Sequence, residues 1–242
     1  MNNTEKYFFE GYNFFEKNIG GQLGANVTNV YVNNVHNEIL NFMKNLNDFK
    51  GFQTDINQLK GNIAEFWHSG TFNINAIARS STNRTTVLQS NEFASIDIGS
   101  NFGYDYGLKY YKTGVDSANQ QAKSIFEKFK EYQAHSGKDD LDKFLSDRGL
   151  SYENINNPIY SGQYRIIPKE QLEEAIKYLE QKIAKESIAR PELAEKYRET
   201  LKMLRTKIED GKGTESISLS TEDAKKIAEL SKEGCVTEEE FV

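Results

Sequence analysis

The sequence predicts a mixed fold of the α+β or α/β class, in which a small mixed sheet of about four strands is flanked by helices. Further helices are expected at the N-terminus and a helical hairpin at the C-terminus. Short runs rich in β-branched and aromatic residues predict the strands, and longer segments with apolar residues at helical spacing predict the helices. Glycine and proline separate these runs and mark the turns between them.

Residues 1–50 form a first region that is rich in Asn and aromatic residues. A stretch crowded with Tyr and Phe ends at Gly20-Gly21, and a second stretch from Val27 to Leu46 repeats apolar residues near helical spacing. Both are predicted to be amphipathic helices that pack on the rest of the chain. A lipid-binding role is disfavoured, because membrane-surface helices carry many Lys or Arg residues on their polar face.

Residues 51–167 form a second region that combines helices with strands. A helix opens near Asp55 and carries apolar residues at helical spacing as far as Ile77. A helix from Asp116 to about Gln133 and a short helix within 138–149 are expected further along the chain. Four strand-like runs complete the region: Thr85–Leu88, Ala94–Ile98, Tyr104–Tyr111 and Tyr164–Ile167.

Residues 168–242 form a third region that is helical in pattern and highly charged. Two apolar stripes, Leu172–Ile183 and Leu193–Ile208, lie on either side of Arg190-Pro191, and proline is common at the first position of a helix. The stripes predict an antiparallel helical hairpin with solvated Glu and Lys faces. The last residues, 237–242, begin like a capped helix, so the native chain is expected to continue past Val242.

The composition limits the class of protein. The chain has 242 residues, 37% hydrophobic and 27% charged, which excludes a collagen-like, mucin-like or disordered protein. No apolar run approaches the roughly 18 to 20 residues of a membrane span, and no signal-peptide pattern opens the chain, so a cytoplasmic protein is expected. The single cysteine, Cys235, excludes an internal disulfide, and the net charge of −6 comes with no basic tail, so a nucleic-acid partner requires a local basic patch.

Familiar catalytic signatures are absent: the sequence has no Walker loop, no Gly-x-Ser-x-Gly elbow and no zinc-deaminase motif. The second region offers instead the order helix, three strands, helix, strand. Glu65 lies in the first helix, Asp97 in the second strand and Lys109 in the third. If the second and third strands pair as a hairpin, Asp97 and Lys109 can meet near the edge of the sheet.

This order and these residues resemble the PD-(D/E)XK nuclease superfamily over roughly residues 55–167. Members often carry a glutamate in the first helix, an aspartate in the second strand and an acid-x-Lys motif in the third, and Gln or Lys commonly lines the next helix. The matching residues of this chain are Glu65, Asp97, Lys109 and Gln120 or Gln121.

The chain departs from that pattern at Gly107, which stands two positions before Lys109, where the superfamily has an acid. Some members carry this acid on the helix, and Glu65 would then be the second carboxylate. Otherwise the site has lost a metal ligand and the chain is only a binding fold.

The resemblance implies a metal-dependent nuclease. Asp97, Glu65 and the carbonyl of Leu108 would hold Mg²⁺ or Mn²⁺, because such ions prefer oxygen ligands. The ion would polarise the scissile phosphate, and Lys109 would orient a water or stabilise charge on the phosphate. Phosphate contacts are expected from four cations: Arg79, Arg84, Lys112 and Lys123.

Each residue also has an ordinary interpretation: Glu65 as a solvated helix residue, Asp97 as an outward position on a half-exposed sheet, and Lys109 as a guard on an edge strand. The alternative is therefore a non-catalytic interaction or scaffold protein with a degenerate nuclease fold, from a bacterial or phage system. It would meet a protein partner through the aromatic N-terminal helices or the C-terminal hairpin. A glycosidase-like or lyase enzyme with paired carboxylates is less well supported, because no cluster of tryptophans accompanies Trp67.

Overall fold

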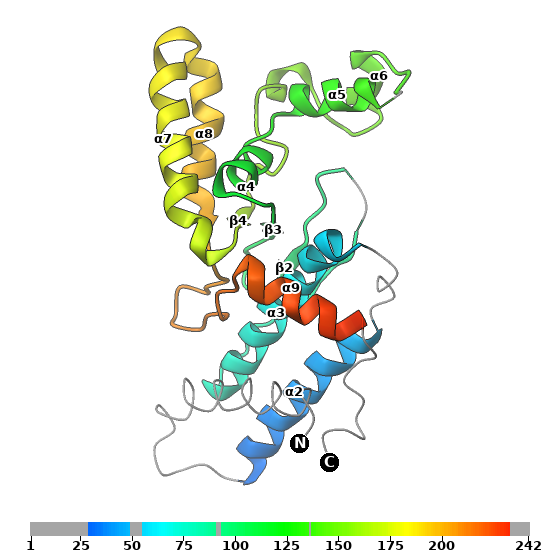
Figure 1. Cartoon of the computed structure of the whole chain (residues 1–242), viewed down its shortest axis with the longest axis vertical. Helices are drawn as coiled ribbons and strands as arrows, with labels where there is room; N and C mark the ends of the chain where they lie inside the picture. Colours follow the sequence, from blue (N-terminus) through cyan, green and yellow to red (C-terminus); the bar gives the residue numbers. More distant parts are fainter. Residues whose placement is uncertain (1–28, 49–54, 91–92, 136, 233–242) are drawn as a thin grey trace. The chain divides into compact units, whose positions relative to one another are not determined.

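The computed structural model of the chain describes residues 29–48, 55–90, 93–135 and 137–232 (Figure 1). The first predicted N-terminal helix and the predicted helix start at 237–242 lie outside these residues. The chain divides into two compact units, each considered by itself: unit 1 comprises Met1–Val87, Ser100–Phe102 and Lys207–Val242, and unit 2 comprises Leu88–Gly99 and Gly103–Thr206. The predicted organisation into regions 1–50, 51–167 and 168–242 stays a prediction.

Unit 1 is mainly helical. Its elements are α2 (Asn29–Asp48), α3 (Ile56–Ala78), β1 (Thr85–Val87) and α9 (Thr221–Lys232). The carboxylate of Asp55 accepts a hydrogen bond from the N–H of Asn57 and so caps α3. The predicted helix that opens near Asp55 is confirmed, as is the strand run that begins at Thr85.

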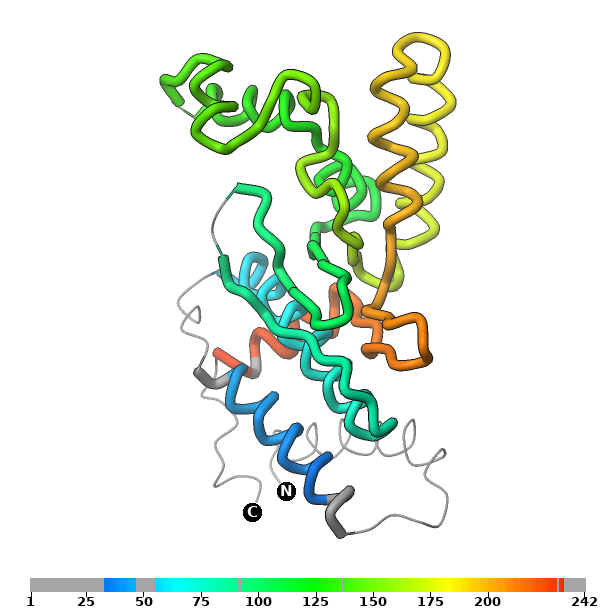
Figure 2. Tube along the Cα trace, turned by 180° about the vertical axis from the view of Figure 1, so that it is seen from behind, coloured from blue at the N-terminus to red at the C-terminus, as the bar shows by residue number. Residues whose placement is uncertain are grey.

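Helix α3 is the centre of unit 1, and it packs against α2 and α9, as the trace in Figure 2 also shows. Leu59 and Ile63 of α3 form a buried cluster with Ala228 of α9. A side chain at Gly70 would overlap the ring of Phe42 on α2, so only glycine allows this close approach of the two helices. Burial of apolar surface on several sides of α3 therefore holds unit 1 together.

The sheet has five strands in the order β1-β2-β3-β4-β5, one more than the four or so predicted. The further strands are β2 (Ile98–Ser100), β3 (Tyr106–Leu108), β4 (Tyr164–Ile166) and β5 (Leu204–Arg205). β2 and β3 pair antiparallel with Ile98 opposite Tyr106, as the predicted hairpin requires. β4 pairs parallel with both β3 and β5, so the sheet is mixed, as predicted.

The extra strand corrects the prediction that the apolar stripe to Ile208 is one helix. The backbone turns to an extended conformation at Leu204, with φ −68° and ψ 133°, and Leu204 pairs with Arg165 of β4. Pairing with β4 satisfies the backbone N–H and C=O groups that no longer bond within the helix after Met203. The apolar periodicity of the segment does not reveal this pairing.

The helices of unit 2 are α4 (Gly114–Gln121), α5 (Ile125–Ala134), α6 (Leu141–Ser146), α7 (Leu172–Ala189) and α8 (Pro191–Met203). Short 3₁₀ turns occupy Tyr152–Asn154 and Lys169–Gln171. The predicted hairpin is confirmed, since α7 and α8 lie side by side (Figure 1) and Pro191 opens α8.

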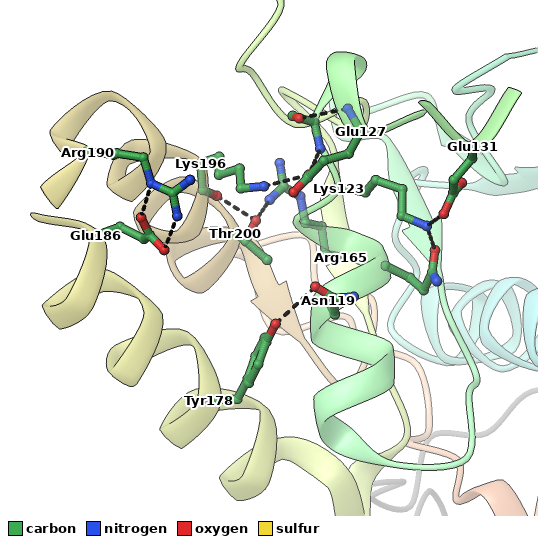
Figure 3. A network of polar contacts seen from close by, with 12 residues as sticks. Asn119, Lys123, Glu127, Glu131, Arg165, Tyr178, Glu186, Arg190, Lys196 and Thr200 are labelled. Atoms are coloured by element: carbon green, nitrogen blue, oxygen red, sulfur yellow. Dashed lines mark hydrogen bonds and ion pairs between the residues drawn. The ribbon is translucent and has the colours of Figure 1, made fainter. Parts of the chain in front are cut away.

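The single helix predicted from Asp116 to Gln133 is wrong, because the chain breaks between α4 and α5. Ser124 caps α5: its hydroxyl accepts from the N–H of Glu127, and the Glu127 carboxylate accepts from the N–H of Ser124. Glu127 also accepts a hydrogen bond from the buried Lys196 of α8 at 2.5 Å (Figure 3). Through Glu127, the capping box at the start of α5 is therefore also bonded to α8 of the C-terminal hairpin.

Two apolar clusters form the core of unit 2. The larger joins α4 to the hairpin and the sheet through Ala118, Ala122, Ile167, Ala175, Leu179, Tyr197 and Leu204. The smaller joins α5 to α6 through Ile125, Phe129, Phe144 and Leu145. Across the described residues of both units, no helix has the length and apolar character needed to cross a membrane.

A buried histidine ties the segment after β5 to α3 within unit 1. His68 is fully buried, and its Nδ1 lies 2.9 Å from the hydroxyl oxygen of Ser216. Ser216 accepts a hydrogen bond from the N–H of Ile208, so its own proton is available for His68 Nδ1. Burial lowers the pKa of His68 from 6.5 to about 3. His68 therefore folds as a neutral ring.

We expect unit 1 to lose stability in acid because of His68. Below about pH 6.5 the unfolded chain protonates this ring, whereas the folded chain does so only near pH 3, so acid favours unfolding across that window. The free energy of unfolding should fall by about 2 kcal/mol between about pH 7.5 and pH 5 from this group. Urea unfolding at both pH values measures the change.

The matched variant is His68→Gln, which cannot titrate. It is expected to be less stable at both pH values but to lose this part of the pH dependence. An equal loss of stability on acidification in wild type and variant would contradict the assignment of that dependence to His68.

Candidate active site

The β2–β3 hairpin brings Asp97 and Lys109 together. Asp97 directly precedes β2 and Lys109 directly follows β3. Both residues were predicted to lie inside these strands, and each lies one residue outside. The N–H of Asp97 donates to the carbonyl of Tyr106 at 3.1 Å, which continues the antiparallel pairing beyond Ile98. The ammonium of Lys109 lies 3.4 Å from Asp97 Oδ2. The predicted carboxylate–ammonium pair is therefore present in unit 2.

The two oxygens of the Asp97 carboxylate have different surroundings. Oδ2 accepts a hydrogen bond from the N–H of Leu108 at 2.6 Å in addition to its ion pair with Lys109. No hydrogen bond to Oδ1 is made by the residues that the structure describes. The side chains of Asp97 and Lys109 are only 16% and 19% exposed, so their charges interact in a partly desolvated setting.

Lys109 is held as an ammonium ion. Burial acts to lower the pKa of Lys109, but the neighbouring Tyr160 and the Asp97 carboxylate outweigh it, so that pKa lies above its ordinary value of 10.5. Its Nζ lies 4.7 Å from the centroid of the Tyr160 ring, a cation–π distance. A lysine in this state donates hydrogen bonds and stabilises negative charge, and it does not act as a base at neutral pH.

Two buried glutamines lie beside the pair. Gln121 of α4 donates through Nε2 to the carbonyl of Gly107 at 3.0 Å, so it holds the middle of β3. Gln163, next to β4, donates through Nε2 to the carbonyl of Ala94 at 3.2 Å. In both glutamines Oε1 is buried without a hydrogen-bond partner among the described residues. Gln121 was predicted at this site, whereas Gln163 and Tyr160 were not, since neither lies in the motif.

Gly107 faces this group of side chains. A Cβ atom at Gly107 would stand 2.9 Å from Gln163 Oε1, 3.8 Å from the ring of Tyr160 and 3.9 Å from Asp97 Oδ2. A side chain at position 107 would therefore enter a space that is bordered by Gln163, Tyr160 and Asp97.

Other predicted residues have separate surroundings. Gln120 does not join the pair: its Oε1 accepts from Lys123 Nζ at 2.6 Å, and Lys123 also pairs with Glu131 (Figure 3). Lys112 is exposed in the segment after β3. The ammonium of Lys123 is thus already engaged, whereas that of Lys112 faces solvent.

Three predicted residues belong to unit 1. Glu65 is half-buried in α3, and its part in the site stays a prediction. The Arg84 guanidinium donates to the carbonyls of Ser81 and Asn83, at 2.8 and 2.7 Å, and Arg79 Nε donates to the side chain of Asn75 at 3.1 Å. Within the described parts of the chain, no group of three or more His, Cys, Asp or Glu side chains is arranged to hold a metal ion.

Arg165 anchors the strand beside Gly107. Its side chain is completely buried, and it pairs with Glu199 of α8 at 2.8 Å. It also donates to the hydroxyl of Thr200 on the same helix (Figure 3). Burial lowers the pKa of Arg165 to about 10, although Glu199 opposes that shift, so the group stays charged at neutral pH. The sequence analysis missed this anchor, and the signal that could have indicated it is an arginine within the apolar run Tyr164–Ile167.

The comparisons with known proteins returned nothing: no protein-family model matches the chain, and neither a curated protein nor a solved structure resembles it significantly.

Removing Glu199 should destabilise unit 2 strongly. Glu199→Ala leaves the Arg165 charge buried without its partner carboxylate, which costs about 3 kcal/mol in the free energy of unfolding. Glu195→Ala, on the same helix, is the control, because Glu195 is 72% exposed and its ion pair is with the exposed Arg198. Chemical denaturation should show a large loss for the first variant and little change for the second. Equal stabilities would refute the anchoring role.

Proposed function

We propose that this chain is a metal-dependent, nuclease-like phosphodiesterase that acts on nucleic acid, with Asp97 and Lys109 as the centre of its site. The observation that carries the proposal is the contact between these two side chains, 3.4 Å apart at the end of the β2–β3 hairpin. Glu65 remains the predicted second carboxylate.

The order of elements supports the same proposal. The chain runs α3, β1, β2, β3, α4 and, after α5, α6 and a 3₁₀ turn, β4. This is in line with the helix, three strands, helix, strand order of the PD-(D/E)XK resemblance. β4 returns parallel to β3, which brings Arg165 beside Gly107. The positions of Asp97 before β2, Lys109 after β3 and Gln121 in α4 support the proposal.

The Asp97 carboxylate suits a hard divalent cation such as Mg²⁺ or Mn²⁺. Its Oδ2 is held in place by the N–H of Leu108 and by Lys109, and its Oδ1 takes no hydrogen bond from the described residues. A bound cation would supply polarisation of the scissile phosphate and a lower pKa for a bound water. Asp97 and the predicted Glu65 would be its carboxylate ligands, with the Leu108 carbonyl as a third oxygen.

Lys109 would stabilise the negative charge that develops on the phosphate. Because its pKa is raised, it carries a full positive charge at neutral pH and donates hydrogen bonds in a partly desolvated setting, where such interactions are strong. Gln121 is a positioning residue, since it binds the Gly107 carbonyl and not the reacting groups. Among the predicted phosphate contacts of unit 2, the exposed Lys112 is better suited to nucleic acid than Lys123, which pairs with Glu131.

A second candidate is nucleic-acid or protein binding without cleavage. Gly107 favours it, because a chain that has lost the acid at this position can keep the fold and lose the chemistry. The exposed faces of α7 and α8 would then serve a protein partner, as predicted for the C-terminal hairpin.

Cleavage assays test the proposal. Purified protein is incubated with plasmid, single-stranded DNA and RNA in the presence of Mn²⁺, and we expect cutting of at least one substrate. Asp97→Asn and Lys109→Met should each lower the rate by about 100-fold or more, since each removes a group that acts on the transition state. Lys130→Met is the matched control, because Lys130 also lies over an aromatic ring, that of Phe126.

Three outcomes are informative. Loss of cutting in both site variants, with Lys130→Met unaffected, supports the proposal. Equal cutting by wild type and Asp97→Asn means a different site or a contaminant. Binding without any cutting by wild type favours the second candidate.

A further inference from the structure

The orientation of the Gln163 amide is determined by its surroundings. Gln163 is 8% exposed, and its Nε2 lies 3.2 Å from the carbonyl oxygen of Ala94. A carbonyl oxygen only accepts hydrogen bonds, so the amide nitrogen must face Ala94 and Oε1 must face the opposite way. Oε1 is buried there without a hydrogen-bond donor among the described residues. A buried amide oxygen in this state is unfavourable unless a further group binds it.

Gln163 Oε1 faces the space in front of Gly107. A Cβ at Gly107 would stand 2.9 Å from this oxygen and 3.9 Å from Asp97 Oδ2, so both oxygens border the same space. Asp97 Oδ2 already accepts hydrogen bonds from the N–H of Leu108 and from Lys109, whereas Gln163 Oε1 has no donor among the described residues. An amide oxygen without a donor, next to a carboxylate, suits a cation or a hydrogen-bond donor in that space. Lys109, the nearby ammonium, already lies against Asp97 and Tyr160.

We infer that Gln163 is a ligand of a divalent cation, and that its amide oxygen replaces the acid that residue 107 does not provide. A carboxylate and an amide carbonyl are the oxygen donors that Mg²⁺ and Mn²⁺ accept. The inference deepens the proposed function and rests on its Asp97 site, but it places the second oxygen ligand in the same unit as Asp97. With few protein ligands, such an ion keeps positions for water and for phosphate oxygens of the substrate.

Titration calorimetry of the full chain with MnCl₂ tests this role without any activity assay. Gln163→Met keeps the side-chain length but removes the oxygen, and we expect the affinity for Mn²⁺ to fall about 10-fold or more. Gln163→Glu adds a charged oxygen at the same place and should tighten binding. Gln171→Met is the control: this buried glutamine of unit 2 has both amide atoms paired, with Ser117 and Tyr111, and its loss should leave Mn²⁺ affinity unchanged.

If Gln163→Met folds poorly, a double variant that moves the oxygen ligand from position 163 to position 107 tests the same role. Gly107 does not adopt a left-handed conformation, and the nearest atom to an added Cβ, at 2.9 Å, belongs to the flexible end of Gln163. In the double variant Gly107→Asp/Gln163→Ala, the carboxylate would stand where the amide oxygen was. Its affinity for Mn²⁺ should exceed that of Gln163→Ala and approach that of wild type. Thermal unfolding confirms the fold of each variant.

The failure of this inference is distinguishable from that of the proposed function. Loss of Mn²⁺ binding in Asp97→Asn, with unchanged binding in Gln163→Met and Gln163→Glu, overturns the ligand role of Gln163 and leaves the proposed function standing. No Mn²⁺ binding by wild type overturns both. Binding that depends on Asp97 and Gln163, in a protein that cuts no nucleic acid, supports the ligand role and overturns the nuclease.

Discussion

The register of the β2–β3 hairpin is the constraint on which the candidate site depends. With Ile98 opposite Tyr106, the residue before one strand and the residue after the other meet at the same end, and they are Asp97 and Lys109. A shift by one residue would place these two side chains on opposite faces of the sheet. Ile98 and Tyr106 are themselves buried, so the apolar core secures the register and with it the charged pair.

The parallel strand β4 brings further side chains, which the β2–β3 hairpin does not supply, next to the charged pair. Arg165 lies opposite Gly107 and is tied to α8 through Glu199, which fixes the segment that carries Gln163 and Tyr160 next to the pair. Gly107 leaves room for these side chains, because an added Cβ would meet the end of Gln163. The amide oxygen of Gln163 therefore lies in the space that a side chain at position 107 would need.

Much of the fold could be predicted because its signals are local. Helical spacing identified α3, α7 and α8, and β-branched and aromatic runs identified β1 to β4 to within a few residues. The errors have tertiary causes. The break at Ser124 depends on a capping box that also binds Lys196, and β5 exists because Leu204 pairs with β4; neither follows from the apolar periodicity of its own segment.

The sequence by itself determined the parts of the site that are close along the chain. Asp97 and Lys109 are separated by one turn, so strand patterning and a hairpin suffice to bring them together. Only the tertiary structure decided that Gln163 and Tyr160 join them, since these residues lie more than fifty positions further along the chain. Their place depends on a parallel crossover through several helices and on a buried arginine, and such long-range pairing leaves no local pattern.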